Sequence, residues 1–190
     1  PRNPVLIVFA AAWYFIQKKD RRFTGSLIAN LERWYWNNNL SKRFDGSTIT
    51  PISEEFTSLL DWFDNPKDIP ESITDFVMAK KMKDIYKVNA QYRSIMCLLI
   101  KNGITDFFDG KRIQDYPDKI DDHHVYPDDF LRTTLGITDN KKINCILNRT
   151  LIHKSTNRSK YVGNISPKSY LTDIRKNLGE VKFKALCEAH

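Results

Sequence analysis

The first hundred residues repeat apolar positions at the spacing of α-helices, with turn-forming clusters between the segments. The expected helices cover residues 4–18, 26–39, 52–64, 72–87 and 90–102. The first of them is apolar on nearly every side, which is typical of a central helix. The last helix is expected to end before Gly103, because glycine is favoured just after the C-terminus of a helix. The pattern therefore predicts a helical subdomain over residues 1–112.

The periodicity changes after these helices. A loop-rich stretch with glycine, proline and many aspartates leads to a short extended segment, DKIDDHHVYP (118–127), which suits a strand ending in a turn. A second strand is expected at 146–152, and the polar STNRSK (155–160) then starts a helix. We therefore expect a mainly helical α+β fold, in which a helical bundle packs on a small ββα unit at 113–165. One or two closing helices should fill 166–190.

The distribution of charge indicates a binding partner for the C-terminal end of the chain. The chain has 190 residues, the size of one ordinary domain, and a net charge of +7. Residues 131–190 hold 12 lysines and arginines against 4 acidic residues, a balance of +8, so the whole surplus lies there. A polyanion is the expected partner of this end, and a merely solvated surface is the alternative.

The cysteines and the longest apolar run indicate where in the cell the chain is expected. The three cysteines are far apart and form no C-x-x-C pair, so neither a disulfide framework nor a cysteine zinc site is expected. The run Val5–Ile16 is shorter than the roughly 20 residues that span a bilayer, and it lacks the form of a signal peptide. We expect a cytoplasmic chain without a membrane segment. The sequence also lacks a phosphate-binding glycine-rich loop, so no nucleotide site is expected in it.

The aromatic cluster RWYWNNN in the second expected helix has two interpretations. In the first, Trp34 and Trp36 are platforms for unpaired bases, since aromatic faces stack on nucleotides. Core packing is the preferred interpretation, because Trp34 shares one helix side with Leu27 and Leu31.

Two adjacent histidines, His123 and His124, end the first expected strand in DDHHVYP. Asn148 follows His124 by 24 positions on the second expected strand, and Asn157 follows Asn148 by 9 at the start of the next helix. Lys160 stands three positions further on. This set, at these intervals, resembles the HNH, or ββα-metal, nuclease motif. The resemblance implies metal-dependent hydrolysis of phosphodiester bonds.

Each role in this motif follows from the reaction. His124 matches the invariant histidine and is the expected general base, since histidine has a pKa suited to proton transfer near neutrality. Asn148 matches the middle letter of the motif, whose side chain holds the loop that carries the base.

His123 and Asn157 occupy the two metal-ligand positions of the motif. An asparagine oxygen suits Mg²⁺ or Mn²⁺, whereas a histidine ligand, in place of the family's more frequent aspartate or glutamate, widens the choice toward Ni²⁺ or Zn²⁺. We expect one divalent ion. Asp122 is a rival ligand, although strand alternation points it away from His123.

Several neighbouring residues complete the expectations. The basic residues expected to contact DNA phosphates are Lys154, Arg158, Lys160 and Lys168. His153 stands where some relatives place a zinc-binding cysteine. It is interpreted as a partly exposed residue at a helix start, because no four-ligand zinc set is visible in the sequence.

The resemblance extends beyond the motif. NLERWYWNNNLSKRFDGST looks like the helical lead-in of the nuclease half of GmrSD-type modification-dependent restriction enzymes, and NRTLIHKSTNRSKYVGNISPKSYL looks like its ending. This implies cutting or nicking of double-stranded DNA in defence against phage. In that family a ParB-like, nucleotide-hydrolysing half senses modified DNA. This chain has no such half and begins at Pro1, so it is expected to be a C-terminal nuclease domain whose partner is that N-terminal sensor.

Two alternatives remain open. A DNA-binding module with an inactive site would keep the basic end and show no cleavage with metal. An HNH nuclease of toxin or homing type would share the chemistry and differ in substrate.

Overall fold

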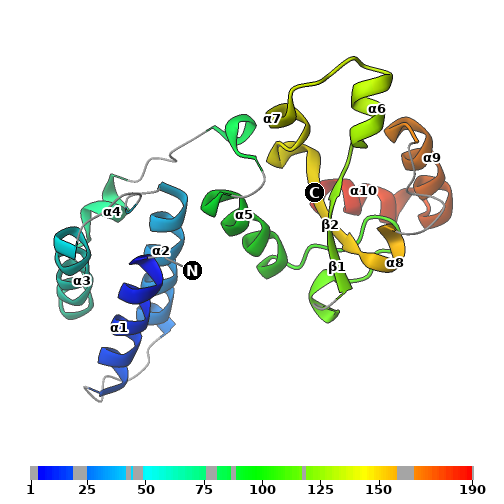
Figure 1. Cartoon of the computed structure of the whole chain (residues 1–190). Helices are drawn as coiled ribbons and strands as arrows, with labels where there is room; N and C mark the ends of the chain where they lie inside the picture. Colours follow the sequence, from blue (N-terminus) through cyan, green and yellow to red (C-terminus); the bar gives the residue numbers. More distant parts are fainter. Residues whose placement is uncertain are drawn as a thin grey trace. The chain divides into compact units, whose positions relative to one another are not determined.

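The structure is a computed structural model that divides into two compact units, Pro1–Lys80 and Lys81–His190 (Figure 1). It describes residues 4–18, 25–41, 44, 49–75, 81–86, 89–116, 119–157 and 165–189. The fold class expected from the sequence, α+β and mainly α, is confirmed, since most of the described residues lie in helices and two strands form a small antiparallel sheet. The units divide after Lys80, whereas the sequence pattern placed the end of the helical subdomain at residue 112.

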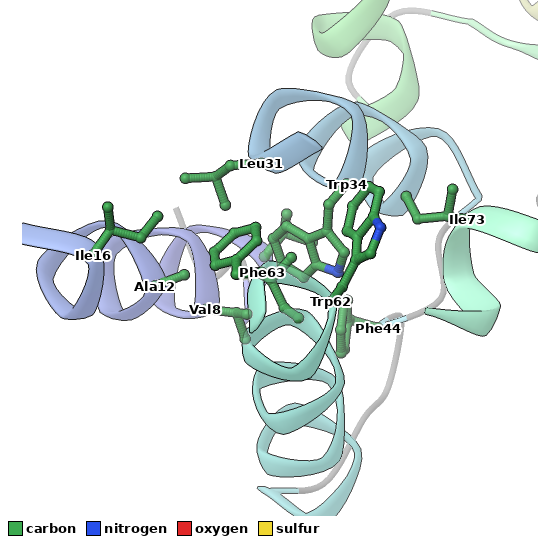
Figure 2. Packing of buried hydrophobic residues seen from close by; sticks show 11 residues of the cluster. Val8, Ala12, Ile16, Leu31, Trp34, Phe44, Trp62, Phe63 and Ile73 are labelled. Atoms are coloured by element: carbon green, nitrogen blue, oxygen red, sulfur yellow. The ribbon is translucent and has the colours of Figure 1, made fainter. Parts of the chain in front are cut away.

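The first unit is built from helices. They are α1 (Pro4–Lys18), α2 (Gly25–Ser41), α3 (Ile49–Asp64) and α4 (Glu71–Thr74). Their core, shown in Figure 2, consists of Val5, Val8, Ala12, Ile16, Leu31, Trp34, Phe44, Leu59, Trp62, Phe63 and Ile73. Trp34 is wholly buried there, and its Nε1 donates to Glu55 Oε1 at 2.8 Å. The core interpretation of Trp34 is therefore confirmed.

Helix α1 is not buried all round, so that expectation is wrong. Val8 and Ala12 lie on the side that packs against α2 and α3. Ile7 and Tyr14 lie outside that contact and are 64% and 60% exposed. An apolar residue on the outer side of a helix is an ordinary feature of protein surfaces.

The single helix expected over 72–87 is also wrong where the structure describes that range, which excludes residues 76–80 and 87. Helix α4 ends at Thr74, and the chain is extended at Lys81 before a short 3₁₀ helix, η1 (Met82–Asp84). The Ile85 carbonyl then accepts a hydrogen bond from the Ile146 amide at 2.7 Å. This pairing with a segment 61 positions later replaces the local helical bonds, so tertiary contacts override the local pattern.

The second unit holds the sheet and its surrounding helices. The elements are α5 (Ala90–Lys101), η2 (Ile113–Asp115), β1 (Ile120–His124), α6 (Asp128–Thr133), α7 (Asn140–Ile143), η4 (Ile146–Asn148), β2 (Arg149–His153), α8 (Lys154–Asn157), α9 (Pro167–Leu178) and α10 (Glu180–Ala189). Helix α5 starts at the side chain of Asn89, which accepts from the Tyr92 amide, and ends before Gly103 at φ +79°. The expected C-cap glycine is thus confirmed.

Strands β1 and β2 form an antiparallel pair in which His123 faces Thr150 and His124 faces Arg149. Helices α6 and α7 lie in the connection between the strands, and α8 follows β2 without a gap (Figure 1). Strand β2 starts three residues later than expected, because 146–148 form a 3₁₀ turn. Among the residues that the structure describes, no helix is both long and apolar enough to span a bilayer.

Candidate active site

The junction of the hairpin with α8 brings His123 and Asn157 together. Asn157 is the last described residue of α8 (Lys154–Asn157), and its Oδ1 lies 3.0 Å from His123 Nδ1. The Asn157 amide nitrogen donates to Asp121 Oδ2 at 3.0 Å. Asp121 lies on the same side of β1 as His123, because side chains alternate along a strand. Three side chains with metal-binding atoms therefore meet at this point.

The His123 group fits a divalent ion on two counts. Neighbouring ligands of a six-coordinate ion at about 2.1 Å lie about 3 Å apart, and the His123 and Asn157 atoms, which are hydrogen-bonded in the structure, have this separation. Burial lowers the pKa of His123 to about 4, against an opposing effect of its contact with Asn157. Its imidazole is therefore neutral near pH 7, the form that binds metal.

His124 is half-buried and is oriented by Asn144, a residue that the sequence did not single out. His124 Nε2 lies 3.1 Å from Asn144 Oδ1. The Asn144 amide nitrogen donates to the Asn140 carbonyl at 3.0 Å, which leaves Oδ1 as the acceptor. On this hydrogen-bond assignment Nε2 carries the proton of His124, and Nδ1 keeps the lone pair that a base requires.

The pKa of His124 is lowered, first by burial and then by the positive charge of Arg149. Asn144 and Asp128 oppose this shift. A neutral histidine is the form that accepts a proton.

Asn148 ties the turn after β1 to the end of α7. Its Oδ1 accepts from the Tyr126 amide at 2.7 Å, and its Nδ2 donates to the Tyr126 carbonyl at 3.1 Å. The same Nδ2 donates to the Ile143 carbonyl at 2.9 Å. The backbone two residues beyond His124 is thereby fixed on both sides.

Asp122 points to the other side of β1, where it joins a buried network. Its Oδ1 accepts from Arg149 Nε at 2.7 Å, and both carboxylate oxygens lie 2.8 Å from the Tyr92 hydroxyl. Burial and then the hydrogen bond to Asp122 raise the pKa of Tyr92. Asp122 therefore joins α5 to the two strands and lies away from the His123 group.

This network predicts a large loss of stability in Asp122→Asn. The Arg149 side chain is only 2% exposed, so the substitution leaves a buried guanidinium without its counter-charge. We expect the free energy of unfolding to fall by about 3 kcal/mol, measured by urea denaturation.

Glu180→Gln is the matched control for that change. It breaks the Arg175–Glu180 pair, whose side chains are 58% and 53% exposed. An exposed pair contributes about 1 kcal/mol or less, so the control should unfold nearly as the parent does. Equal losses in the two variants would contradict the structural role of Asp122.

A second group, Asp106, Asp109 and His153, could also hold a metal ion. Their ligand atoms lie within 4.8 Å of one another, and His153 Nδ1 is 3.3 Å from Asp106 Oδ2. His153 lies in β2 and is only 5% exposed, so its interpretation as a partly exposed helix-start residue is wrong. Asp106 already accepts from the amides of Phe108 and His153 at 2.9 and 2.8 Å. These bonds also give the group a structural role, joining a loop to β2.

The basic residues expected to contact DNA are only partly described. Lys154 opens α8 and is half-buried, and Lys168 is exposed in the first turn of α9. Arg158 and Lys160 lie outside the described residues.

Comparisons with known proteins give one relative. The chain is 32% identical over 143 residues to the uncharacterized protein MJ0686 of Methanocaldococcus jannaschii. The match covers 70% of this chain and 23% of that protein, so the chain spans about a quarter of the relative's length. No family model matches the chain. No solved structure matches it.

Proposed function

We propose that the second unit is a metal-dependent DNA endonuclease or nickase of the ββα-metal class. The observation that carries the proposal is the contact of His123 with Asn157 at 3.0 Å across 34 positions of sequence. His124 follows His123 directly in the sequence, and Asn144 orients its ring. A general base and a group of metal ligands at the end of one strand are the parts that phosphodiester hydrolysis requires.

Asp121, His123 and Asn157 would hold the ion. A bound divalent cation would neutralise charge on the scissile phosphate and on the leaving oxygen. Two oxygen ligands favour Mg²⁺ or Mn²⁺, and the histidine nitrogen extends the choice to Ni²⁺ or Zn²⁺. The group at Asp106 is the competing location for an ion.

His124 supplies the base in this proposal. Its Nδ1 would take a proton from the attacking water, while Asn144 Oδ1 accepts the hydrogen bond from Nε2–H and keeps the ring in one tautomer. Asn148 acts indirectly, because it fixes the backbone of Tyr126 in the turn that follows the base.

The basic C-terminal end would bind the substrate. The +8 balance of residues 131–190 favours a phosphate backbone, and Lys154 and Lys168 lie in the helices that follow β2. Biologically, we place this activity in defence against phage, within a modification-dependent restriction enzyme. Recognition of the modification would belong to a separate nucleotide-hydrolysing sensor domain.

Incubation with supercoiled plasmid and a panel of Mg²⁺, Mn²⁺, Ni²⁺ and Zn²⁺ tests the proposal. We expect relaxed or linear product with at least one of these ions and none after EDTA treatment. Relaxed product identifies a nickase, and linear product identifies double-strand cleavage. DNA binding without cleavage under every ion would favour an inactive binding module, in which affinity still falls steeply with salt.

A further inference from the structure

An open apolar groove lies beside the turn that follows His124. Its walls include Tyr126, Leu135 and Leu147, which are 45%, 52% and 64% exposed. These are large apolar side chains gathered on one surface of the second unit. Exposed apolar side chains that gather in a groove with a polar rim are one mark of a binding site.

The aromatic wall of the groove is fixed in advance. The side-chain amide of Asn148 bonds the backbone of Tyr126 on both sides, at 2.7 and 3.1 Å. The Tyr126 ring nevertheless stays half-exposed at the groove. A ring held on a fixed backbone loses little entropy on binding a flat partner, so it suits stacking.

The charges around the groove point to an anionic occupant. Lys83 and Lys142 line it together with the apolar side chains. Of the described residues that line the groove, none is acidic. An apolar, aromatic floor with a lysine rim is the combination that binds an unpaired nucleotide, since the base stacks and the phosphate meets the cations.

The groove also adjoins the proposed base. Tyr126 is two residues from His124, and Asn144, which contacts the His124 ring, stands between the groove residues Lys142 and Cys145. A base in this groove is therefore carried by a nucleotide close to the one whose phosphodiester would be attacked by the water that His124 deprotonates.

We propose that this groove takes an unstacked nucleobase next to the scissile phosphate, so that the chain prefers DNA with unpaired nucleotides over uninterrupted duplex. This proposal rests on the proposed nuclease function for the meaning of the scissile bond. The groove's affinity for an unpaired base is independent of cleavage.

Binding without metal tests the proposal. A 20-base-pair duplex is compared with the same DNA carrying a short central bubble that contains 2-aminopurine. We expect the parent chain to bind the bubble on the order of tenfold more tightly, because one stacked base contributes about that much. The fluorescence of 2-aminopurine should be quenched in the complex.

Substitutions in the groove test whether its side chains cause the preference for bubble DNA. Tyr126→Ala and Leu147→Ala should each remove most of the bubble preference and leave duplex affinity unchanged, while Tyr126→Phe, which keeps the ring, should retain the preference. Val181→Ala changes an apolar side chain that is 83% exposed in α10 and should behave as the parent. Thermal melts of the four variants establish that each is folded.

Equal binding of bubble and duplex by the parent, or an equal loss on both DNAs in Tyr126→Ala, would overturn the proposal and leave the groove to a protein partner. Plasmid cleavage separates this result from the nuclease proposal. Cleavage with no bubble preference refutes the groove alone, and a Tyr126-dependent preference with no cleavage under any ion refutes the nuclease alone.

Discussion

His124→Ala is expected to lower the single-turnover rate of plasmid cleavage by about 10²- to 10⁴-fold at saturating metal. The variant lacks the Nδ1 lone pair that the proposed reaction needs. DNA affinity should stay near that of the parent, because phosphate contacts are assigned to lysines and arginines outside the turn. The measurement compares cleavage rate with binding by fluorescence polarisation on the same DNA.

Asn144→Ala provides the matched comparison. It leaves the His124 ring in place and removes the oxygen that accepts the hydrogen bond from Nε2–H. We therefore expect a smaller loss of cleavage rate, on the order of tenfold. If Asn144 acts only through His124, the double variant should be no slower than His124→Ala alone. Additive losses would assign Asn144 a separate role, and substantial activity in His124→Ala would remove the base from the proposed mechanism.

Local signals in the sequence predict those parts of the fold that local forces determine. Helix α5 is one example, since Asn89 caps its start and Gly103 follows its end. Strand β1 is another, because a short extended segment is bounded by turn residues. Both elements formed where the pattern placed them.

Parts of the fold that depend on distant contacts were not predictable from such signals. The Ile85 carbonyl bonds the Ile146 amide, so the backbone at the end of the expected helix over 72–87 pairs with the start of the second expected strand. Nothing in the sequence around Ile85 or Ile146 indicates that these two segments pair. Helices α6 and α7 were missed for a related reason, since six and four residues are too few for a helical period to be recognised.

Some residues of the candidate site were likewise predictable from the sequence, and others were not. Motif spacing selected His123 and Asn157, and the structure brings them into contact. Strand alternation contained the signal for Asp121, which stands two residues before His123 and so shares its side of β1. Nothing local marked Asn144, because its contact with His124 exists only after the connection between the strands folds back.

The two groups of candidate metal ligands give the second large expected effect. Asn157→Ala and His123→Ala should each weaken Mn²⁺ binding at least about tenfold in calorimetry, because each removes one of three proposed ligands, and metal-dependent cleavage should fall with occupancy. Asn157→Asp should retain binding, since a carboxylate oxygen replaces the amide oxygen and adds a negative charge.

Asp109→Asn is the control for the metal experiment, because Asp109 is the exposed member of the other group and its loss leaves the bond between Asp106 and the His153 amide intact. The control should bind Mn²⁺ as the parent does. If it loses the ion while Asn157→Ala and His123→Ala keep it, the metal lies beside His153, and the contact between His123 and Asn157 is a structural hydrogen bond. If neither set changes binding, no ion is held by either group, and the proposed hydrolytic mechanism loses its metal.

The number of ions bound per chain is an independent measurement. If one ion is bound and Asn157→Ala abolishes its binding, that ion lies at the hairpin and α8. Two ions, of which one survives that change, assign the second to Asp106, Asp109 and His153.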